Sequence, residues 1–182
     1  HMFNLSTQEV VLSIENTPLV NLDGKYFQEY QNFFGKNFTF PNITKSKFKK
    51  LENQEHLARR ILDPDDIQLK KLQIFFMNKQ ITNALEKKYE LDLKFDSVDV
   101  WQDLSGYYLT PHTDNESIKV AVQIYLSDHD QGTCMYDHEN EIVHTFPFKN
   151  NFGYSLLNNE NSLHGVPEIK KDGRISLYVR YQ

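Results

Sequence analysis

The pattern of apolar and polar positions divides the chain near residue 90. Before that point, apolar residues recur mostly at the three- and four-residue intervals of amphipathic helices. The longest such stretch, residues 65–89, begins with two acidic residues that favour the positive end of a helix dipole. Shorter helices are predicted over residues 26–35 and 51–62, and a short strand over residues 10–14. We therefore expect mainly helical support over about residues 2–90.

After residue 90 the apolar positions form short runs of β-branched and aromatic residues, separated by turn-forming residues. Strands are predicted over residues 98–104, 119–126, 132–137, 141–146, 154–157 and 174–181. Helices followed by many short strands favour a mostly β fold in which the helices pack on one sheet. The expected fold is a jelly roll, or double-stranded β-helix, with its core over about residues 91–182. Together with the N-terminal helices it forms a single domain over residues 2–182.

Composition and charge narrow the choice of compartment and partner. The 182 residues carry a net charge of -5 at pH 7, which gives no general electrostatic footprint for nucleic acid. A local run of Lys45, Lys47, Lys49 and Lys50 is more typical of a solvated surface than of a phosphate site. No apolar run reaches the roughly 18 residues of a membrane span. The single cysteine, Cys134, cannot form an internal disulfide, so we expect a cytoplasmic protein.

The candidate chemistry centres on His112 and Asp114. Side chains two apart on an extended strand point to the same face, so an imidazole nitrogen and a carboxylate oxygen can reach one point. A second imidazole from another strand, for which His164 is the candidate, would complete three ligands on one side of a metal. Two histidines and one carboxylate with open positions are typical of non-haem Fe(II) oxygenases. The alternative is that these residues make ordinary turn hydrogen bonds.

A different metal set could be built from His129, His138 and His144 with neighbouring aspartates. These histidines lie in predicted turns or on a hairpin, and we expect them to face solvent.

Residues 107–181 resemble the catalytic core of the Fe(II)/2-oxoglutarate-dependent dioxygenases, particularly the small prolyl-hydroxylase-like branch. The matching pieces, in chain order, are Pro-His-Thr-Asp (111–114), Ile-Tyr-Leu-Ser (124–127), Gly-Thr (132–133), His-Gly-Val (164–166) and Gly-Arg-Ile-Ser-Leu (173–177). They cover about the C-terminal two-fifths of the chain, and the N-terminal part carries no matching motif. The resemblance implies that His112, Asp114 and His164 bind Fe(II), and that 2-oxoglutarate and O2 are co-substrates.

The resemblance also implies three residues that bind 2-oxoglutarate. Arg174 lies ten residues after His164, where the family places the residue that binds the distal carboxylate, and the planar fork of arginine suits that role. Ser176 is similar to the family's hydroxyl partner, and Tyr125 to the phenol that reaches the same carboxylate. Arg180 shares the face of Arg174, and the two could exchange roles.

The activity implied is hydroxylation of a substrate C–H bond, coupled to decarboxylation of 2-oxoglutarate to succinate and CO2. Halogenating relatives lack the carboxylate ligand, so Asp114 favours hydroxylation. The resemblance points to a peptidyl prolyl or other protein residue as substrate, with a free amino acid or other small molecule as the alternative. Trp101, Tyr107 and Tyr108 are candidates for the substrate rim or for the core, and Asn158 is a candidate for the pocket lining.

Two other classes of function stay open on sequence alone. A cupin-like metal-dependent isomerase or epimerase would bring more histidines to the metal and would not need Arg174 as a carboxylate clamp. A non-catalytic binding module could have kept the jelly roll and lost turnover, although the complete set of three ligands with Arg174 argues against it.

Overall fold

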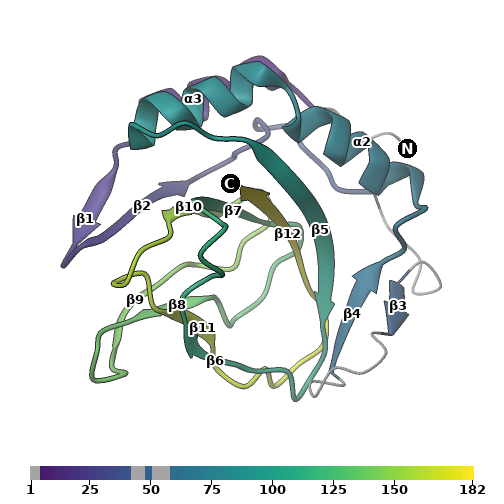
Figure 1. The fold of residues 1–182 in the computed structure, drawn as a ribbon. Helices are drawn as coiled ribbons and strands as arrows, with labels where there is room; N and C mark the ends of the chain where they lie inside the picture. The colour runs from purple at the N-terminus through teal and green to yellow at the C-terminus, as the bar shows by residue number, and fades with distance from the viewer. Residues whose placement is uncertain (1–4, 42–47, 51–57) are drawn as a thin grey trace.

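The computed structural model describes residues 5–41, 48–50 and 58–182, and within them two antiparallel sheets face each other (Figure 1). The larger sheet has the order β1 (Val20–Leu22), β2 (Lys25–Tyr30), β10 (Gly153–Leu157), β7 (Val120–Tyr125), β12 (Arg174–Tyr181), β5 (Phe95–Asp103), β4 (Arg59–Leu62), β3 (Phe48–Lys50). The smaller sheet has the order β6 (Leu109–His112), β11 (His164–Val166), β8 (Cys134–Tyr136), β9 (Ile142–Thr145). This is the expected double-stranded β-helix.

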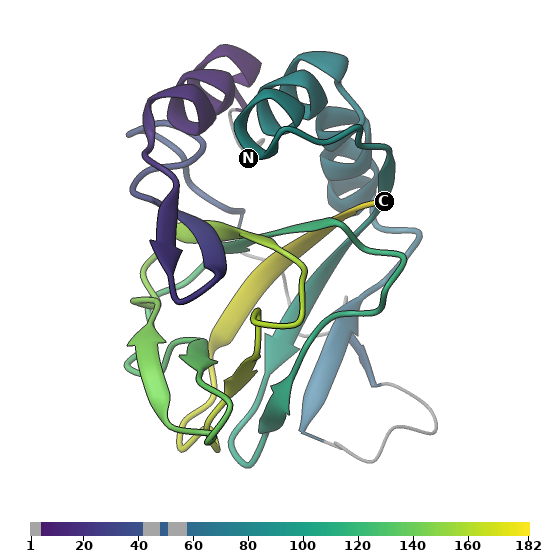
Figure 2. The ribbon, with the colours of Figure 1, turned by 60° about the vertical axis from the view of Figure 1, so that its left-hand side comes forward.

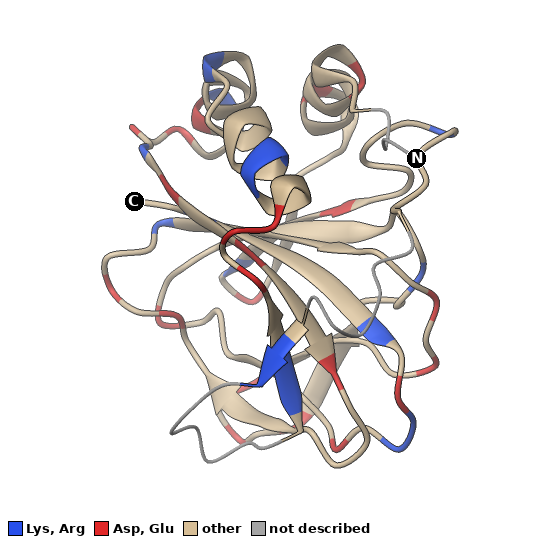
Figure 3. Cartoon of the chain, turned by 90° about the vertical axis from the view of Figure 1, so that its right-hand side faces the viewer, with Lys and Arg blue, Asp and Glu red and all other residues tan. Residues whose placement is uncertain are grey.

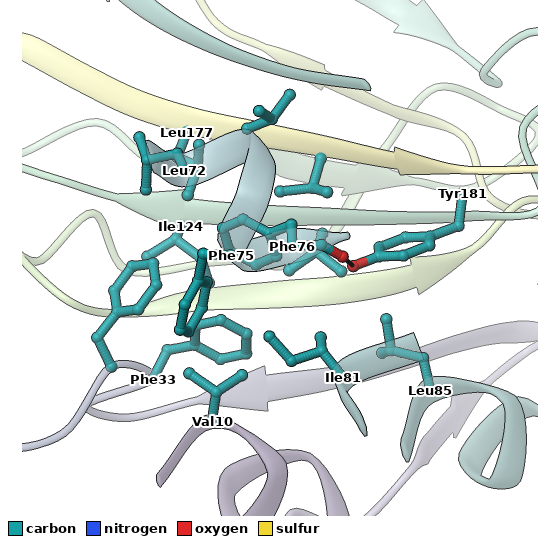
Figure 4. Close-up of a cluster of buried hydrophobic side chains, with 14 of the residues drawn as sticks. Val10, Phe33, Leu72, Phe75, Phe76, Ile81, Leu85, Ile124, Leu177 and Tyr181 are labelled. Atoms are coloured by element: carbon teal, nitrogen blue, oxygen red, sulfur yellow. Dashed lines mark hydrogen bonds between the residues drawn. The ribbon is translucent and has the colours of Figure 1, made fainter. Parts of the chain in front are cut away.

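Within the described residues, helices cover the outer face of the larger sheet, which confirms the predicted packing of helices on one sheet (Figure 2). They are α1 (Thr7–Asn16), α2 (Ile67–Phe76) and α3 (Lys79–Tyr89). Apolar side chains of the helices meet alternate residues of the central strands, for example Leu177 and Val179 of β12, in the main core. Figure 4 shows this cluster, in which the Tyr181 hydroxyl donates to the carbonyl oxygen of Phe76 (3.1 Å). Burying each of these large side chains contributes roughly 1.5–3 kcal/mol. No helix among the described residues is both long enough and apolar enough to cross a membrane.

The alternation along β12 directs its other side chains to the inner face of the larger sheet, toward the smaller sheet. Arg174, Ser176, Tyr178 and Arg180 therefore lie on the side where β6 and β11 approach. A strand that buries apolar residues outward thus presents polar groups to the space between the sheets.

The N-terminal part differs from its prediction because tertiary contacts override local pattern. Residues 10–14, predicted as a strand, lie within α1, where the Ser6 side chain accepts from the Glu9 amide (3.2 Å) and caps the helix. The predicted helix over 26–35 is wrong, since residues 25–30 form β2. Aromatic residues on both faces of β2 are buried, between α1 on one side and the smaller sheet on the other. The sequence of β2 therefore lacks the alternation of apolar and polar residues that marks a half-exposed strand.

Two further helix predictions need correction. The long helix expected over 65–89 is two helices, because Asn78 caps a new one by accepting from the Gln80 amide (2.9 Å). Of the helix expected over 51–62, residues 51–57 lie outside the described part of the chain, and 59–62 form strand β4.

The C-terminal part follows its prediction closely. The six expected strands are β5, β7, β8, β9, β10 and β12, each within a few residues of its predicted ends. The prediction lacked β6 and β11, which are only four and three residues long. These two strands carry His112 and His164.

Candidate metal centre

His112 and His164 lie directly opposite each other on the paired strands β6 and β11, with ring centroids 4.6 Å apart. Asp114 follows β6 by two residues, and its Oδ1 lies 3.9 Å from Nε2 of His164. One ligand atom from each of the three residues falls within 4.8 Å of the others. Within the described residues, this is the only group of three or more such side chains placed to share a metal ion.

The orientation of both imidazoles is fixed by the backbone. Nδ1 of His112 lies 2.9 Å from the carbonyl oxygen of Thr110, and Nδ1 of His164 lies 2.9 Å from that of Ser162. A carbonyl oxygen only accepts, so each Nδ1 carries the proton and donates it. The lone pair on Nε2 is then free for a metal, as in most protein histidine–metal sites.

Electrostatics favour the same form of His164. Burial lowers the pKa of this imidazole below its ordinary value, and the nearby His112 lowers it further, while Asp114 opposes both effects. The neutral imidazole is the form that binds a metal. Two such nitrogens and a carboxylate on one side are the donor set of the Fe(II) facial triad, so the residues fit that ion.

The three ligand candidates line a cavity of about 160 Å³ between the two sheets. Its other walls include Arg59, Trp101, Thr133 and Tyr178. The Tyr178 hydroxyl is buried without a hydrogen-bond partner of ordinary geometry, and its pKa is raised mainly by burial and further by the Asp114 carboxylate. A metal held by the triad would therefore face this cavity, with the Tyr178 hydroxyl in its wall.

Arg174 and Tyr125, two of the three predicted 2-oxoglutarate residues, meet at Thr133. The Tyr125 hydroxyl and Nη2 of Arg174 each donate to the Thr133 hydroxyl, both at 3.1 Å. Burial raises the pKa of Tyr125 to about 12, with Arg174 opposing the shift. Ser176, the third, is buried two residues after Arg174 on the same face of β12, and its hydroxyl accepts a hydrogen bond from the Gln123 side chain (3.2 Å). These positions are compatible with the predicted roles, which stay predictions.

No protein-family model and no curated protein matches the sequence. Solved structures do match. A prolyl 4-hydroxylase from Phytophthora capsici is 16% identical with a TM-score of 0.64, covering 100% of this chain and 67% of its own. A 2OG-Fe(II) oxygenase family protein from Burkholderia pseudomallei is 11% identical with a TM-score of 0.55, and the match covers 97% of this chain and 77% of that protein. A prolyl-4-hydroxylase from Pseudomonas putida is 15% identical with a TM-score of 0.56, and the match covers 76% of this chain and 78% of that protein.

The chain has the fold of the 2OG-Fe(II) oxygenases. On this oxygenase fold the metal candidates predicted from sequence, His112, Asp114 and His164, converge at one point between the sheets.

Three residues at or beside the cavity were missed by sequence reasoning: Arg59, Asp103 and Thr133. Asp103 is fully buried and lies between Arg174 of β12 and Arg59 of β4. Arg59 lines the cavity, but its segment was predicted as a helix, so no sequence signal placed it beside the site. For Thr133 a signal did exist, because it belongs to the Gly-Thr piece of the resemblance.

The rim candidates separate in the structure. Trp101 lines the cavity, whereas Tyr107 is 2% exposed and packs with Val166 and Ile169 in a small separate cluster. Tyr108 is exposed. Asn158 anchors the loop after the metal motif, because its amide donates to the carbonyl oxygens of Asp114, Asn115 and Ile118.

The other histidines are engaged elsewhere. His129, His138 and His144 contact, respectively, the carbonyl oxygen of Lys171, the side chain of Asn161 and the carboxylate of Glu29. They do not gather into a metal set among the described residues.

Of the predicted basic run, residues 45 and 47 lie outside the described part of the chain. Lys49 pairs with Asp63 (2.8 Å), and Lys50 is exposed on β3. Figure 3 shows acidic and basic positions interspersed on this side of the molecule.

Proposed function

We propose that the protein is an Fe(II)- and 2-oxoglutarate-dependent dioxygenase that hydroxylates a substrate C–H bond. The observation that carries the proposal is the convergence of His112, Asp114 and His164 on one cavity inside an oxygenase fold. In this reaction one oxygen atom of O2 enters the substrate as a hydroxyl group. The other enters succinate, as 2-oxoglutarate loses CO2.

The residues of the chain would divide the work as follows. His112, Asp114 and His164 hold the metal from one side, and the two backbone carbonyls keep their imidazoles in the ligating tautomer. Bound Fe(II) supplies the oxidative chemistry with 2-oxoglutarate and O2. Thr133 belongs to the cavity wall, and the buried Arg174, Tyr125 and Ser176 are the residues that the resemblance assigns to the distal carboxylate of 2-oxoglutarate.

For the substrate we propose a peptidyl prolyl or other protein residue. The support is the resemblance of residues 107–181 and the likeness to solved structures named as prolyl 4-hydroxylases. Trp101 lines the same cavity as the metal ligands and offers an apolar surface that would suit a proline ring. A free amino acid or another small molecule is the alternative, since one fold hosts many substrates.

The decisive experiment is an anaerobic titration of the metal-free protein with Fe(II) and then 2-oxoglutarate. We expect a visible charge-transfer absorption in the wild type and none in His112→Ala. Admission of O2 in the presence of prolyl peptides or free amino acids should then yield succinate in proportion to hydroxylated product. Metal binding without the absorption would contradict the proposal and favour the isomerase or binding-module alternatives.

A further inference from the structure

Two arginines share one buried carboxylate at the end of the cavity away from Asp114. Strand pairing places Arg59 of β4 and Arg174 of β12 on either side of Asp103 of β5. Oδ1 of Asp103 accepts from Nε of Arg59 (2.6 Å), and Oδ2 accepts from Nη1 of Arg174. The side chains of Asp103 and Arg174 are fully buried, and that of Arg59 is 16% exposed.

This arrangement carries an excess positive charge. Each guanidinium is always charged, so two arginines with one carboxylate leave one positive charge without a partner among the residues that the structure describes. The next acid on the same face, Asp99, is paired with Arg180 (2.8 Å). A charge withdrawn from water is unfavourable unless it is paired, so the site favours an incoming anion.

The contacts of the two arginines show which of them can meet that anion. Arg174 is occupied by the Asp103 carboxylate, the Thr133 hydroxyl and the carbonyl oxygen of Gln131 (3.3 Å), and its guanidinium lies against the Phe148 ring. Arg174 does not line the cavity, whereas Arg59 does.

Arg59 has donors that no described residue uses. Its Nε is bound to Asp103, and its two terminal nitrogens have no hydrogen-bond partner among the described residues. The guanidinium lies 4.6 Å from the ring centroid of Trp101 and 4.3 Å from that of Tyr107. The two aromatic contacts and the Asp103 bond hold the fork in place before any ligand arrives, which reduces the ordering cost of binding.

We propose that Arg59 directly binds the distal carboxylate of the 2-oxo dicarboxylate co-substrate, and that Asp103 and Arg174 position it. The inference rests on the proposed function and departs from the resemblance, which assigns this contact to Arg174. Because the ligand's charge neutralises the excess, Arg59 also makes the site selective for a dicarboxylic over a monocarboxylic 2-oxo acid. The specificity residue thus comes from β4, outside residues 107–181 that carry the resemblance.

The test is calorimetric titration of protein loaded anaerobically with Fe(II), using 2-oxoglutarate and 2-oxopentanoate. The two ligands have the same carbon chain, and 2-oxopentanoate lacks only the distal carboxylate. The wild type should prefer 2-oxoglutarate by about ten- to hundred-fold, the range of charged hydrogen bonds. Arg59→Met should lose most of this preference while its affinity for 2-oxopentanoate stays the same.

Arg60→Met is the matched control, because Arg60 is the adjacent arginine on the opposite face of β4 and does not line the cavity. It should keep the wild-type preference. An unchanged preference in Arg59→Met would overturn the inference and return the contact to Arg174. If the wild type binds neither ligand, the proposed function itself fails.

Circular dichroism shows whether Arg59→Met is folded. If it is not, a second variant, Arg59→Lys, tests the inference. Arg59→Lys keeps the positive charge and removes the planar fork between the two rings. A several-fold drop in the preference for 2-oxoglutarate would support the inference, and a wild-type preference would overturn it.

Discussion

His112 and His164 are held by the same local device on two paired strands: Nδ1 of each donates to the carbonyl oxygen two residues earlier, at 2.9 Å in both cases. The direction of each Nε2 is therefore a property of the backbone rather than of a neighbouring side chain. Because β6 and β11 place the two residues opposite each other, the register of one strand pair sets the distance between the imidazoles. The metal site thus depends directly on the sheet.

Replacing one imidazole should abolish tight metal binding. His164→Ala leaves two ligand candidates, and we expect Fe(II) affinity to fall by more than about 100-fold, beyond the range caused by outer-shell changes. Anaerobic calorimetry with Fe(II) measures this. His138→Ala is the control: its ring hydrogen-bonds to the Asn161 side chain and does not line the cavity, so the variant should bind Fe(II) as the wild type does. Equal affinity in both variants would mean that the triad does not hold the ion.

Gly165→Ala should damage the site through the strand register. A Cβ at this position would lie 2.6 Å from the carbonyl oxygen of Leu109, so β11 would have to move away from β6. We expect the free energy of unfolding to fall by about 1–3 kcal/mol, with weaker Fe(II) binding. Gly106→Ala is the comparison. A Cβ at this position would meet no atom within 4 Å, but the backbone there has a positive φ of 89°. This variant should lose stability through backbone strain and keep its Fe(II) affinity.

Removing Asp103 should leave the guanidiniums of the buried Arg174 and the largely buried Arg59 without their shared carboxylate. We expect Asp103→Ala to lower the free energy of unfolding by about 3–5 kcal/mol, the usual result of breaking a buried ion pair. Chemical denaturation measures this. Asp65→Ala, whose carboxylate is 91% exposed and lies 3.5 Å from Lys70, should change stability by less than about 0.5 kcal/mol. Similar small losses in both variants would show that the arginines find other partners.

Alkaline pH should destabilise the fold through buried tyrosines. Burial is the main cause that raises the pKa of Tyr125 and of Tyr107, each to about 12, from the ordinary tyrosine value of about 10. Between about pH 10 and pH 12, each of these tyrosines has lost its hydroxyl proton in the unfolded chain but keeps it in the folded protein. The free energy of unfolding therefore falls as the pH rises above 10. Denaturation at stepped pH should show this decline, with phenolate absorbance appearing as the chain unfolds. Constant stability up to pH 12 would contradict the prediction.

The sequence by itself determined six of the eight jelly-roll strands after residue 90 and the pairing of His112 with Asp114. Both are local signals: short β-branched runs between turns, and two side chains that a single extended segment directs to one face. The same local logic failed where aromatic residues are buried on both faces, as in β2, and where Val10 and Ile14 turn inward from a capped helix.

Only the tertiary structure decided which charged groups meet at the end of the cavity. Arg59, Asp103 and Arg174 come from three strands, and they meet because β4 and β12 both pair with β5 in a register that places them side by side. Strand pairing joins segments far apart in the chain, and its register follows from burial of whole sheet faces. No local pattern contains that information, so the charge balance of the site emerged from the fold alone.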